Sequence, residues 1–286
     1  NGDDEWTQRL LARFAGEKIT FGQGMTNDLV GWRAHYENDC VRFSACTDLA
    51  REETRIGIPG GFSLYNALAA LCAVQALGVP LHALAEALQD CTGVKGRCEV
   101  VPMQAPFTVI IDYAHTPDGL KNILSTVGTF ADGRVIALFG CGGDRDKSKR
   151  PLMARIAAKN ADFVVLTSDN PRTEDPYAIL RGALPGLLAE RTPFAVIEER
   201  RRAIAFALEE GRAGDVIVLC GKGHETYQEI GTTKYHLDER EVVRECFARE
   251  QRKEAAQAAK ENEHEDHHRL YSELRGIRDH GEISGS

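Results

Sequence analysis

Apolar and polar positions follow a regular alternation over residues 105–247 of this chain. Short apolar runs rich in valine and isoleucine alternate with longer helical patterns. The runs are Phe107–Asp112, Val135–Gly140, Phe163–Thr167, Phe194–Ile197 and Val216–Cys220. The helical patterns between them are Pro117–Phe130, Arg150–Asn160, Tyr177–Leu188 and Arg200–Glu210. This alternation predicts an α/β fold, with a doubly wound, Rossmann-like parallel sheet covered by helices on both faces.

The preceding part, residues 1–104, has a weaker pattern. Lys18–Phe21 and Cys40–Ser44 alternate between polar and apolar residues, which predicts edge strands of a sheet. Phe62–Leu77 is rich in alanine and leucine and is followed by a glycine and a proline, so it predicts a buried helix with a stop signal. A second, shorter helix is predicted for Leu81–Asp90.

The last part, residues 248–286, is rich in charged residues and histidine and has few large apolar residues. Such a composition is typical of a charged, flexible tail. His264, His267 and His268 lie among carboxylates with no predicted fold around them, so we interpret them as surface residues rather than metal ligands. No function is assigned to this tail.

Composition narrows the class of protein. The chain has 286 residues, enough for one large domain or two ordinary ones, and is 43% hydrophobic and 27% charged, as is usual for globular proteins. Its net charge of −8 argues against a nucleic-acid partner. The eight cysteines form no CxxC pair and are expected to be reduced. With no apolar run of about 20 residues and no signal pattern, we expect a cytoplasmic protein without membrane insertion.

Polar clusters follow four of the five predicted strands. They are Asp112–Pro117, Gly140–Pro151, Ser168–Glu174 and Gly221–Glu225. Turn formation explains the glycines and prolines of these clusters but not an arginine or lysine, usually with a carboxylate, in three of them. Because ligands of doubly wound sheets bind beyond the carboxyl ends of the strands, we predict one shared polar site at this edge.

Several common sites are excluded by the spacing of these residues. The dinucleotide fingerprint GxGxxG requires a glycine where Arg145 stands, so a nicotinamide oxidoreductase is a remote alternative. The phosphate loop GxxxxGK[ST] does not occur in the sequence. Asp112 and His115 lack a serine or cysteine nucleophile in an elbow motif. Thr116 and Pro117 also fit the start of a helix.

Four of these motifs, in order, resemble the C-terminal domain of the Mur ligases. They are DYAHTP (Asp112–Pro117), GCGGDRDKSKRP (Gly140–Pro151), SDNPRTEDP (Ser168–Pro176) and GKGHETYQ (Gly221–Gln228). Upstream, Gly61, Phe62 and Asn66, with Gly93–Glu99, resemble the end of the central ATPase domain of that family. The resemblance implies residues 1–104 as the truncated end of that ATP-binding domain, residues 105–247 as the amino-acid-binding domain and 248–286 as the tail.

Within that family, Asp169–Arg172 resembles the signature of the members that add meso-diaminopimelate, whereas lysine-adding members have another residue in place of the arginine. The resemblance implies that Arg145 and Arg172 hold carboxylates of this amino acid. Asp169, Asn170 and Glu225 would face its ammonium groups, Pro171 completes the motif, and Gly221 would allow close approach of the backbone. A planar guanidinium suits a carboxylate, because it forms two parallel hydrogen bonds with it.

The same resemblance implies that Asn66, Arg97, Asp112 and His115 contact ATP, with Arg97, Asp112 and His115 in catalytic roles. The implied reaction has two steps: the carboxylate of a UDP-linked muramoyl dipeptide attacks ATP, and the amine then displaces phosphate from the acyl phosphate. Magnesium is implied as a second cofactor, with unassigned ligands. Structural alternatives are a buried polar helix residue bonded to the backbone for Asn66 and an ion pair with Glu99 for Arg97.

The family's uridine-nucleotide domain, phosphate loop and magnesium ligands would all precede Asn1. We therefore expect this chain, as a fragment or truncated relative and a monomer, to form no peptide bond alone; turnover with precursor and ATP would refute this. Two alternatives remain open, a non-catalytic amino-acid-binding module and a lysine-adding ligase. The fold alone supports any of them, so the site residues must decide.

Overall fold

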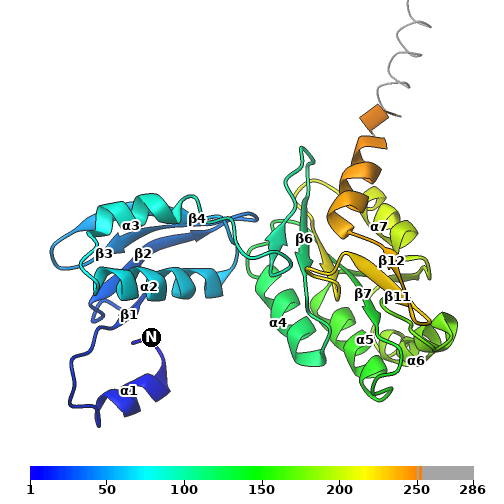
Figure 1. The fold of residues 1–286 in the computed structure, drawn as a ribbon, viewed down its shortest axis with the longest axis horizontal. Coiled ribbons are helices and arrows are strands. Elements are labelled where there is room, and N and C mark those ends of the chain that lie inside the picture. The colour runs from blue at the N-terminus through cyan, green and yellow to red at the C-terminus, as the bar shows by residue number, and fades with distance from the viewer. Residues whose placement is uncertain (250, 253–286) are drawn as a thin grey trace, which may run out of the picture.

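A computed structural model describes residues 1–249 and 251–252, which form two lobes, each built on its own sheet (Figure 1). The first lobe begins with the short helix α1 (Glu5–Leu11). Its sheet has the order β1-β2-β3-β4, with β1 parallel to β2 and the other pairs antiparallel. The strands are β1 (Phe21–Gly22), β2 (Leu29–Tyr36), β3 (Val41–Cys46) and β4 (Arg51–Ile56).

Two helices, α2 (Gly61–Gln75) and α3 (Leu81–Leu88), pack on this sheet as the alanine- and leucine-rich pattern predicts. Leu64 and Leu68 of α2 are buried against Phe43 of β3 in one core. The prediction of an edge strand at Cys40–Ser44 is wrong, since β3 pairs on both sides, with β2 and β4. Alternation reports one buried face, and it carries no information on the number of neighbouring strands.

The second lobe contains a six-stranded sheet with the order β5-β6-β10-β7-β8-β9. Every pair from β6 to β9 is parallel, and only β5 is antiparallel to its neighbour. The strands are β5 (Glu99–Val100), β6 (Thr108–Asp112), β7 (Val135–Cys141), β8 (Phe163–Ser168), β9 (Phe194–Val196) and β10 (Val216–Cys220).

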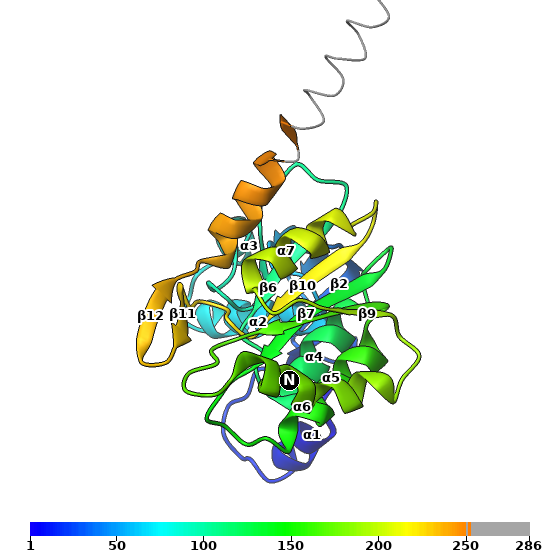
Figure 2. The same ribbon diagram turned by 90° about the vertical axis from the view of Figure 1, so that its right-hand side faces the viewer.

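Helices cover both faces of this sheet (Figure 2). One face carries α4 (Pro117–Val127), α5 (Lys149–Asn160) and α6 (Pro176–Leu188); the other carries α7 (Arg200–Glu209) and a helix over residues 239–249. The central strands are buried on both faces, which accounts for their unbroken apolar runs. The doubly wound α/β fold predicted from the sequence is confirmed.

The chain adds β7, β8 and β9 in order on one side of β6 and then returns to insert β10 between β6 and β7, with all five strands parallel. The loops after β6, β7, β8 and β10 therefore converge at one edge, where a doubly wound sheet holds its ligands. Local signals fix the helix that follows β6: the Thr116 hydroxyl accepts from the Gly119 amide at 3.1 Å, with Pro117 in the first turn.

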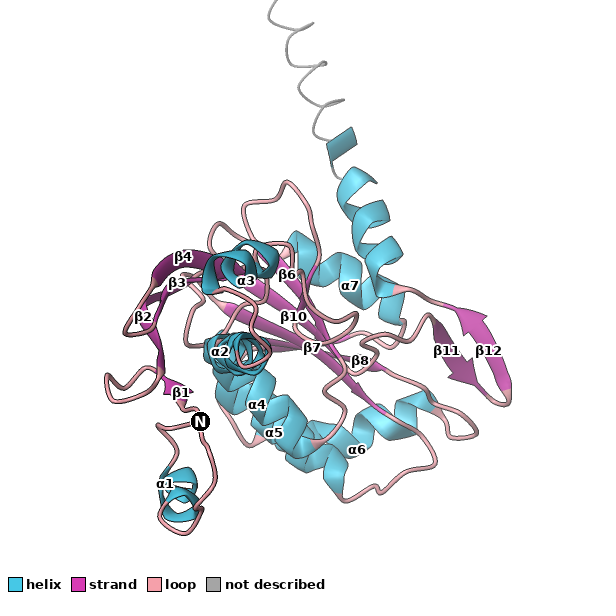
Figure 3. Ribbon diagram, turned by 60° about the vertical axis from the view of Figure 1, so that its left-hand side comes forward, coloured by secondary structure: helices cyan, strands magenta, loops and turns pink. Residues whose placement is uncertain are grey.

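Two elements of this lobe lie outside the predicted pattern. β5 joins the sheet although it precedes residue 105, at which the sequence places the start of the domain. A hairpin of β11 (Tyr227–Ile230) and β12 (Thr233–His236) follows β10 and projects beyond the sheet (Figure 3). The predicted tail begins at residue 248 inside the helix over residues 239–249, and residues 253–286 lie outside the described residues.

None of the described helices combines the length and the apolar character that a membrane span requires.

Candidate functional site

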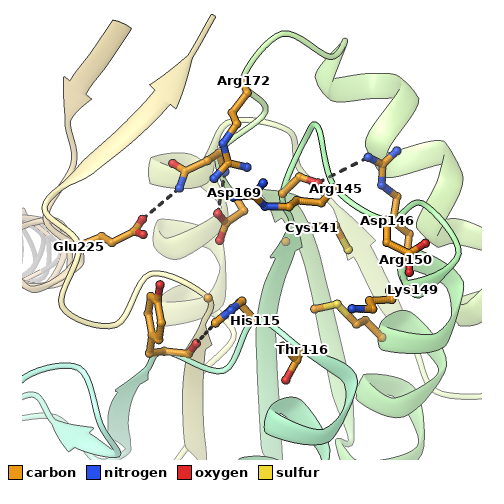
Figure 4. A pocket seen from close by; sticks show the side chains of 16 residues that line it. His115, Thr116, Cys141, Arg145, Asp146, Lys149, Arg150, Asp169, Arg172 and Glu225 are labelled. Carbon is orange, nitrogen blue, oxygen red and sulfur yellow. Dashed lines mark hydrogen bonds between the residues drawn. The ribbon is translucent and has the colours of Figure 1, made fainter. Parts of the chain in front are cut away.

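A cavity of about 370 Å³ opens at the carboxyl ends of β6, β7, β8 and β10. Most of the residues predicted to bind an amino acid line it, and Figure 4 shows Asp169, Arg145 and Arg172 meeting over the strand ends. The predicted residues in its wall are Arg145, Asp169, Asn170, Arg172, Gly221 and Glu225. Among these predicted amino-acid-binding residues, the structure brings together Arg145 and Glu225, which are 80 positions apart in sequence.

Pro171 is the member of that set that does not line the cavity. It is buried beside Gly143, where a Cβ would lie 1.8 Å from the Pro171 carbonyl oxygen. The Gly143 amide also donates to the Asn170 carbonyl oxygen at 2.9 Å. Pro171 thus fixes the loop after β8 against the loop after β7.

Asp169 presents an unpaired oxygen to this cavity. Its Oδ1 accepts from the Asn170 amide at 2.7 Å, whereas its buried Oδ2 has no hydrogen-bond partner among the described residues. Gly221, with φ at +114°, faces Oδ2, and a Cβ there would lie 2.5 Å from that oxygen. A buried carboxylate oxygen without a donor is costly, so the arrangement fits a cationic or N–H-bearing ligand group.

The two arginines of the cavity differ in their surroundings. Arg172 has a positive φ of 50°, and its Nε donates to Glu229 Oε2 at 3.1 Å while its Nη1 donates to the Gly143 carbonyl at 2.8 Å. Arg145 is exposed and forms no ion pair with any described residue. One guanidinium is held in place and the other is free to adjust, and both face the same cavity.

A buried lysine supports the opposite side of the site. Lys222 donates to Asn170 Oδ1 and, at 3.1 Å, to Glu225 Oε2, while Asn170 Nδ2 donates to the same carboxylate at 3.0 Å. Burial lowers the pKa of Lys222, and the nearby Asp169 and Glu225 carboxylates oppose that shift. The network orients the Asn170 and Glu225 side chains that line the cavity.

The wall beneath α5 contains a second ion pair. Arg150 is buried and its Nη2 donates to Glu174 Oε1 at 2.8 Å. This hydrogen bond holds the pKa of Glu174 at about 2, with help from the Asp144 amide and the charge of Lys147. The thiol of Cys141 also lines the cavity, but burial raises its pKa to about 12, so it stays protonated and is no nucleophile.

The residues predicted to contact ATP are more dispersed. His115 lines the cavity, whereas Asn66, Arg97 and Asp112 do not. Asn66 is exposed on α2, so the alternative of a buried helix residue is wrong. The ion pair of Arg97 with Glu99 is also wrong: Glu99 pairs with Arg240.

Asp112 and His115 are both tied to the backbone. Asp112 accepts from the Cys98 and Ala114 amides, each at 2.8 Å, and burial raises the pKa of its carboxyl group. His115 Nδ1 lies 2.8 Å from the Tyr113 carbonyl oxygen. The Arg97 guanidinium lies over the Tyr113 ring, 5.1 Å from its centroid, so the loop after β6 contacts both the Arg97 and the His115 side chains.

Comparison with known proteins places this site in a family. Residues 96–223 match the family described as Mur ligase, glutamate ligase domain. The chain is 44% identical to the UDP-N-acetylmuramoyl-L-alanyl-D-glutamate--2,6-diaminopimelate ligase of Clostridium botulinum over 249 residues, which is 86% of the chain. The chain belongs to the Mur ligase family. The ligase of the same name from Gloeobacter violaceus is 45% identical over 250 residues.

Solved structures of Mur ligases have the same fold. A UDP-N-acetylmuramoyl-L-alanyl-D-glutamate--2,6-diaminopimelate ligase superposes with a TM-score of 0.71 and 33% identity, over 87% of this chain and 52% of that one. A UDP-N-acetylmuramate-alanine ligase from Thermotoga maritima has a TM-score of 0.56 and 21% identity, which supports the fold alone. The chain spans about half the length of the curated relatives it matches, 51% for both the Clostridium botulinum and the Gloeobacter violaceus ligases.

Sequence reasoning missed the residues that hold this Mur ligase site in place. Glu229 and Lys222 pair with residues of the Asp169–Arg172 loop, Arg150 pairs with Glu174, and Arg200 forms a fully buried ion pair with Glu239 below the sheet. Arg150, Glu174 and Lys222 lie inside motifs that the sequence singled out. Their supporting role was missed because the sequence does not show that these side chains are largely buried and paired. Glu229, Arg200 and Glu239 carried no local signal.

The Arg150–Glu174 pair predicts a specific dependence of stability on pH. The pKa of Glu174 is lowered from 4.5 to about 2, so the stability it contributes is present above pH 4.5 and is lost as the pH falls through that interval. We expect Glu174→Gln to be less stable than the wild type at pH 7, and the gap to shrink towards pH 2. Urea unfolding between pH 7 and pH 2.5 would measure it; a gap independent of pH would contradict the ion pair.

Proposed function

We propose that this chain supplies the amino-acid site of an ATP-dependent ligase that adds meso-diaminopimelate to UDP-N-acetylmuramoyl-L-alanyl-D-glutamate in peptidoglycan synthesis. The names of the relatives that match most of the chain support this reaction. One structural observation carries the proposal: the unpaired, buried Asp169 Oδ2 and the guanidinium groups of Arg145 and Arg172 face one cavity.

The charges of the cavity suit an amino acid whose far end bears both an ammonium and a carboxylate. Asp169 Oδ2 and Glu225 offer acceptors for the ammonium, and Arg172 and Arg145 offer donors for the carboxylates. L-Lysine has the ammonium but lacks the second carboxylate, so it would leave a guanidinium without its partner. Arg172 is only partly exposed, and leaving such a charged donor without the ligand carboxylate would cost up to roughly 1–3 kcal/mol, which is the proposed source of selectivity.

For the nucleotide, we propose that Arg97 contacts ATP from the segment before β5 and that His115 contacts it from the loop after β6. Asp112 would fix the loop after β6, and Asn66 would reach ATP from α2. Cationic groups there would stabilise charge on the transferred phosphoryl group. The residues present do not fit a magnesium–phosphate cradle. The sequence has no phosphate loop. The carboxylates of Glu37 and Asp39 lie together at the β2–β3 turn, but the third group beside them is the thiol of Cys40, and magnesium prefers oxygen ligands.

No reaction step is therefore assigned to magnesium in this chain, although the whole ligase is proposed to use it. We propose that residues 105–247 together with β5 form the amino-acid-binding unit, and that the first lobe belongs to an ATP-binding unit. A monomeric, cytoplasmic enzyme remains our expectation.

Calorimetric titration with meso-diaminopimelate and, separately, L-lysine tests the amino-acid site. We expect selective binding of meso-diaminopimelate, weakened about 10- to 100-fold in Arg172→Ala because charge-assisted hydrogen bonds are lost. Alanine keeps a Cβ at the positive φ of this position, so the backbone strain does not change. Arg181→Ala is the matched control, an exposed arginine of α6 that pairs with Asp175 outside the cavity.

Equal binding by Arg172→Ala and the wild type would contradict the site. Preference for L-lysine would instead favour the lysine-adding alternative, and binding without any effect of ATP would favour a binding module.

A further inference from the structure

We propose that Glu229 of β11 is a specificity-determining positioning residue, which fixes the Arg172 guanidinium so that only a carboxylate entering end-on is bound. This inference rests on the proposed function, because it concerns the same amino-acid site. Glu229 does not line the cavity and lies outside every motif that the sequence singled out. Its effect on the ligand would therefore act through Arg172.

The first observation is that the hairpin holds Arg172 by both backbone and side chain. The Arg172 amide donates to the Glu229 carbonyl at 3.1 Å, and the Gly231 amide donates to the Arg172 carbonyl at 2.7 Å. The Arg172 side chain then returns to the same strand, with Nε 3.1 Å from Glu229 Oε2. These bonds maintain the positive φ of 50°, a conformation that is unfavourable for an L-residue.

The hairpin holds the rest of the motif as well. Gln228 Nε2 donates to the Asp169 carbonyl at 2.7 Å, and the Glu229 amide donates to Asn170 Oδ1 at 2.9 Å. In contrast, β12 is exposed along its whole length, so the hairpin adds little to the apolar core. Its contacts point to a bracing role for the loop after β8.

The hydrogen bonds of Arg172 decide which part of the guanidinium a ligand meets. Of its five N–H donors, one on Nε is used by Glu229 and one on Nη1 by the Gly143 carbonyl. The three that remain are one on Nη1 and two on Nη2, so both terminal nitrogens can still donate at the end of the guanidinium. A carboxylate therefore fits end-on with two hydrogen bonds, whereas approach from the Nε side is blocked by Glu229.

The charge of Glu229 adds a second effect. Arg172 and Glu229 are each less than a third exposed, with side-chain exposures of 22% and 29%, so their ion pair is only partly screened by solvent. The pair neutralises much of the guanidinium charge before a ligand arrives. Anions that make a single contact then gain little, and geometry rather than net charge selects the ligand.

Variants of Glu229 in the chain described here test this role by calorimetry with meso-diaminopimelate and L-lysine. We expect Glu229→Leu to weaken meso-diaminopimelate about tenfold or more and to change the affinity for L-lysine less than about twofold, because lysine has no carboxylate for Arg172. Glu229→Gln should stay within about threefold of the wild type, since its amide oxygen still accepts from Nε. The control is Glu241→Leu, which removes an exposed carboxylate that pairs with His236.

A merely structural role would lower the affinity for both ligands together and would not be rescued by glutamine; that result, or unchanged meso-diaminopimelate binding in Glu229→Leu, overturns the proposal.

The NMR signal of the Arg172 Nε–H provides a readout that needs no ligand. We expect a slowly exchanging signal in the wild type and Glu229→Gln that is lost in Glu229→Leu. If the wild type binds neither amino acid, the proposed function fails, while a signal unaffected by Glu229→Leu shows separately that Glu229 does not hold Arg172.

Discussion

Replacing Arg200 by methionine is expected to destabilise the second lobe by about 3–5 kcal/mol. Arg200 and Glu239 are fully buried, and the Nε of Arg200 donates to Glu239 Oε1 at 2.8 Å. Methionine would leave the Glu239 carboxylate buried without its cation, and Glu239 Oε2 already lacks a hydrogen-bond partner among the described residues. Burial raises the pKa of Glu239, which reflects the same cost of holding the charge away from water.

Arg200 also ties two strand ends of the site together. Its Nη1 and Nη2 donate to the carbonyl oxygens of Ser168 and Cys220, at 3.2 Å and 2.8 Å. These residues end β8 and β10 and directly precede Asp169 and Gly221. The variant should therefore lose two further hydrogen bonds below the cavity.

Urea unfolding, with amide hydrogen exchange in β8 and β10 as the report from this lobe, measures the effect. Arg201→Met is the matched control, because Arg201 is the next residue of α7 and pairs with Glu245 at the surface, where we expect a loss below about 1 kcal/mol. The double variant Arg200→Met/Glu239→Leu should recover much of the loss, since it removes the unpaired charge. Equal losses in Arg200→Met and Arg201→Met would refute the role of burial.

Gly96→Ala is expected to detach the segment before β5 from the site loop, with a loss of more than about 3 kcal/mol. Gly96 has a φ of +73°, and a Cβ there would lie 2.1 Å from the His224 amide nitrogen and 2.3 Å from the Gly223 carbonyl carbon. Both neighbours are backbone atoms of the loop that carries Gly221 and Glu225, so no side chain can rotate away. The alanine must therefore displace one of the two segments.

Gly78→Ala separates the effect of the clash from that of the backbone angle. Gly78 follows α2 with a φ of +89°, and a Cβ there would meet nothing within 4 Å. We expect it to cost only the roughly 1–2 kcal/mol of a left-handed L-residue. Hydrogen exchange of the Cys98 amide, which donates to Asp112 Oδ2, reports on the docked segment. Similar protection in Gly96→Ala and the wild type would contradict the proposed contact.

The Gly96 contact belongs to a set of contacts that joins the segment around β5 to the loop after β10, which carries Gly221 and Glu225. Arg240 donates to Glu99 through Nε at 2.8 Å and through Nη2 at 2.5 Å, and its Nη2 also donates to the Gly223 carbonyl at 2.8 Å. Glu99 is in β5, and Gly223 is in the loop between Gly221 and Glu225. Backbone and charged contacts therefore connect this loop directly to Gly96 and Glu99.

The sequence by itself located the five parallel strands of the second sheet, but not β5. Valine- and isoleucine-rich runs can be buried on both faces only in a parallel sheet covered by helices, so β6, β7, β8, β9 and β10 were found within two residues of their ends. The position of the site also followed, because loops after parallel strands meet at one edge. The polar clusters that contain Arg145, Asp169, Arg172 and Glu225 were found in this way. The resemblance to the Mur ligases singled out these residues within the clusters, and their roles remain proposals.

Only the tertiary structure decided how these side chains are held. Arg240 and Glu99 are 141 residues apart, and Arg200 and Glu239 are 39 apart, so no local pattern links them. The hairpin that braces Arg172 has two short strands, half-buried in β11 and exposed in β12, without a strong apolar alternation, and its Glu229 lies 57 residues from Arg172 in the sequence. Periodicity reports which face of an element is buried, whereas the partner of a buried charge is set by packing between distant segments.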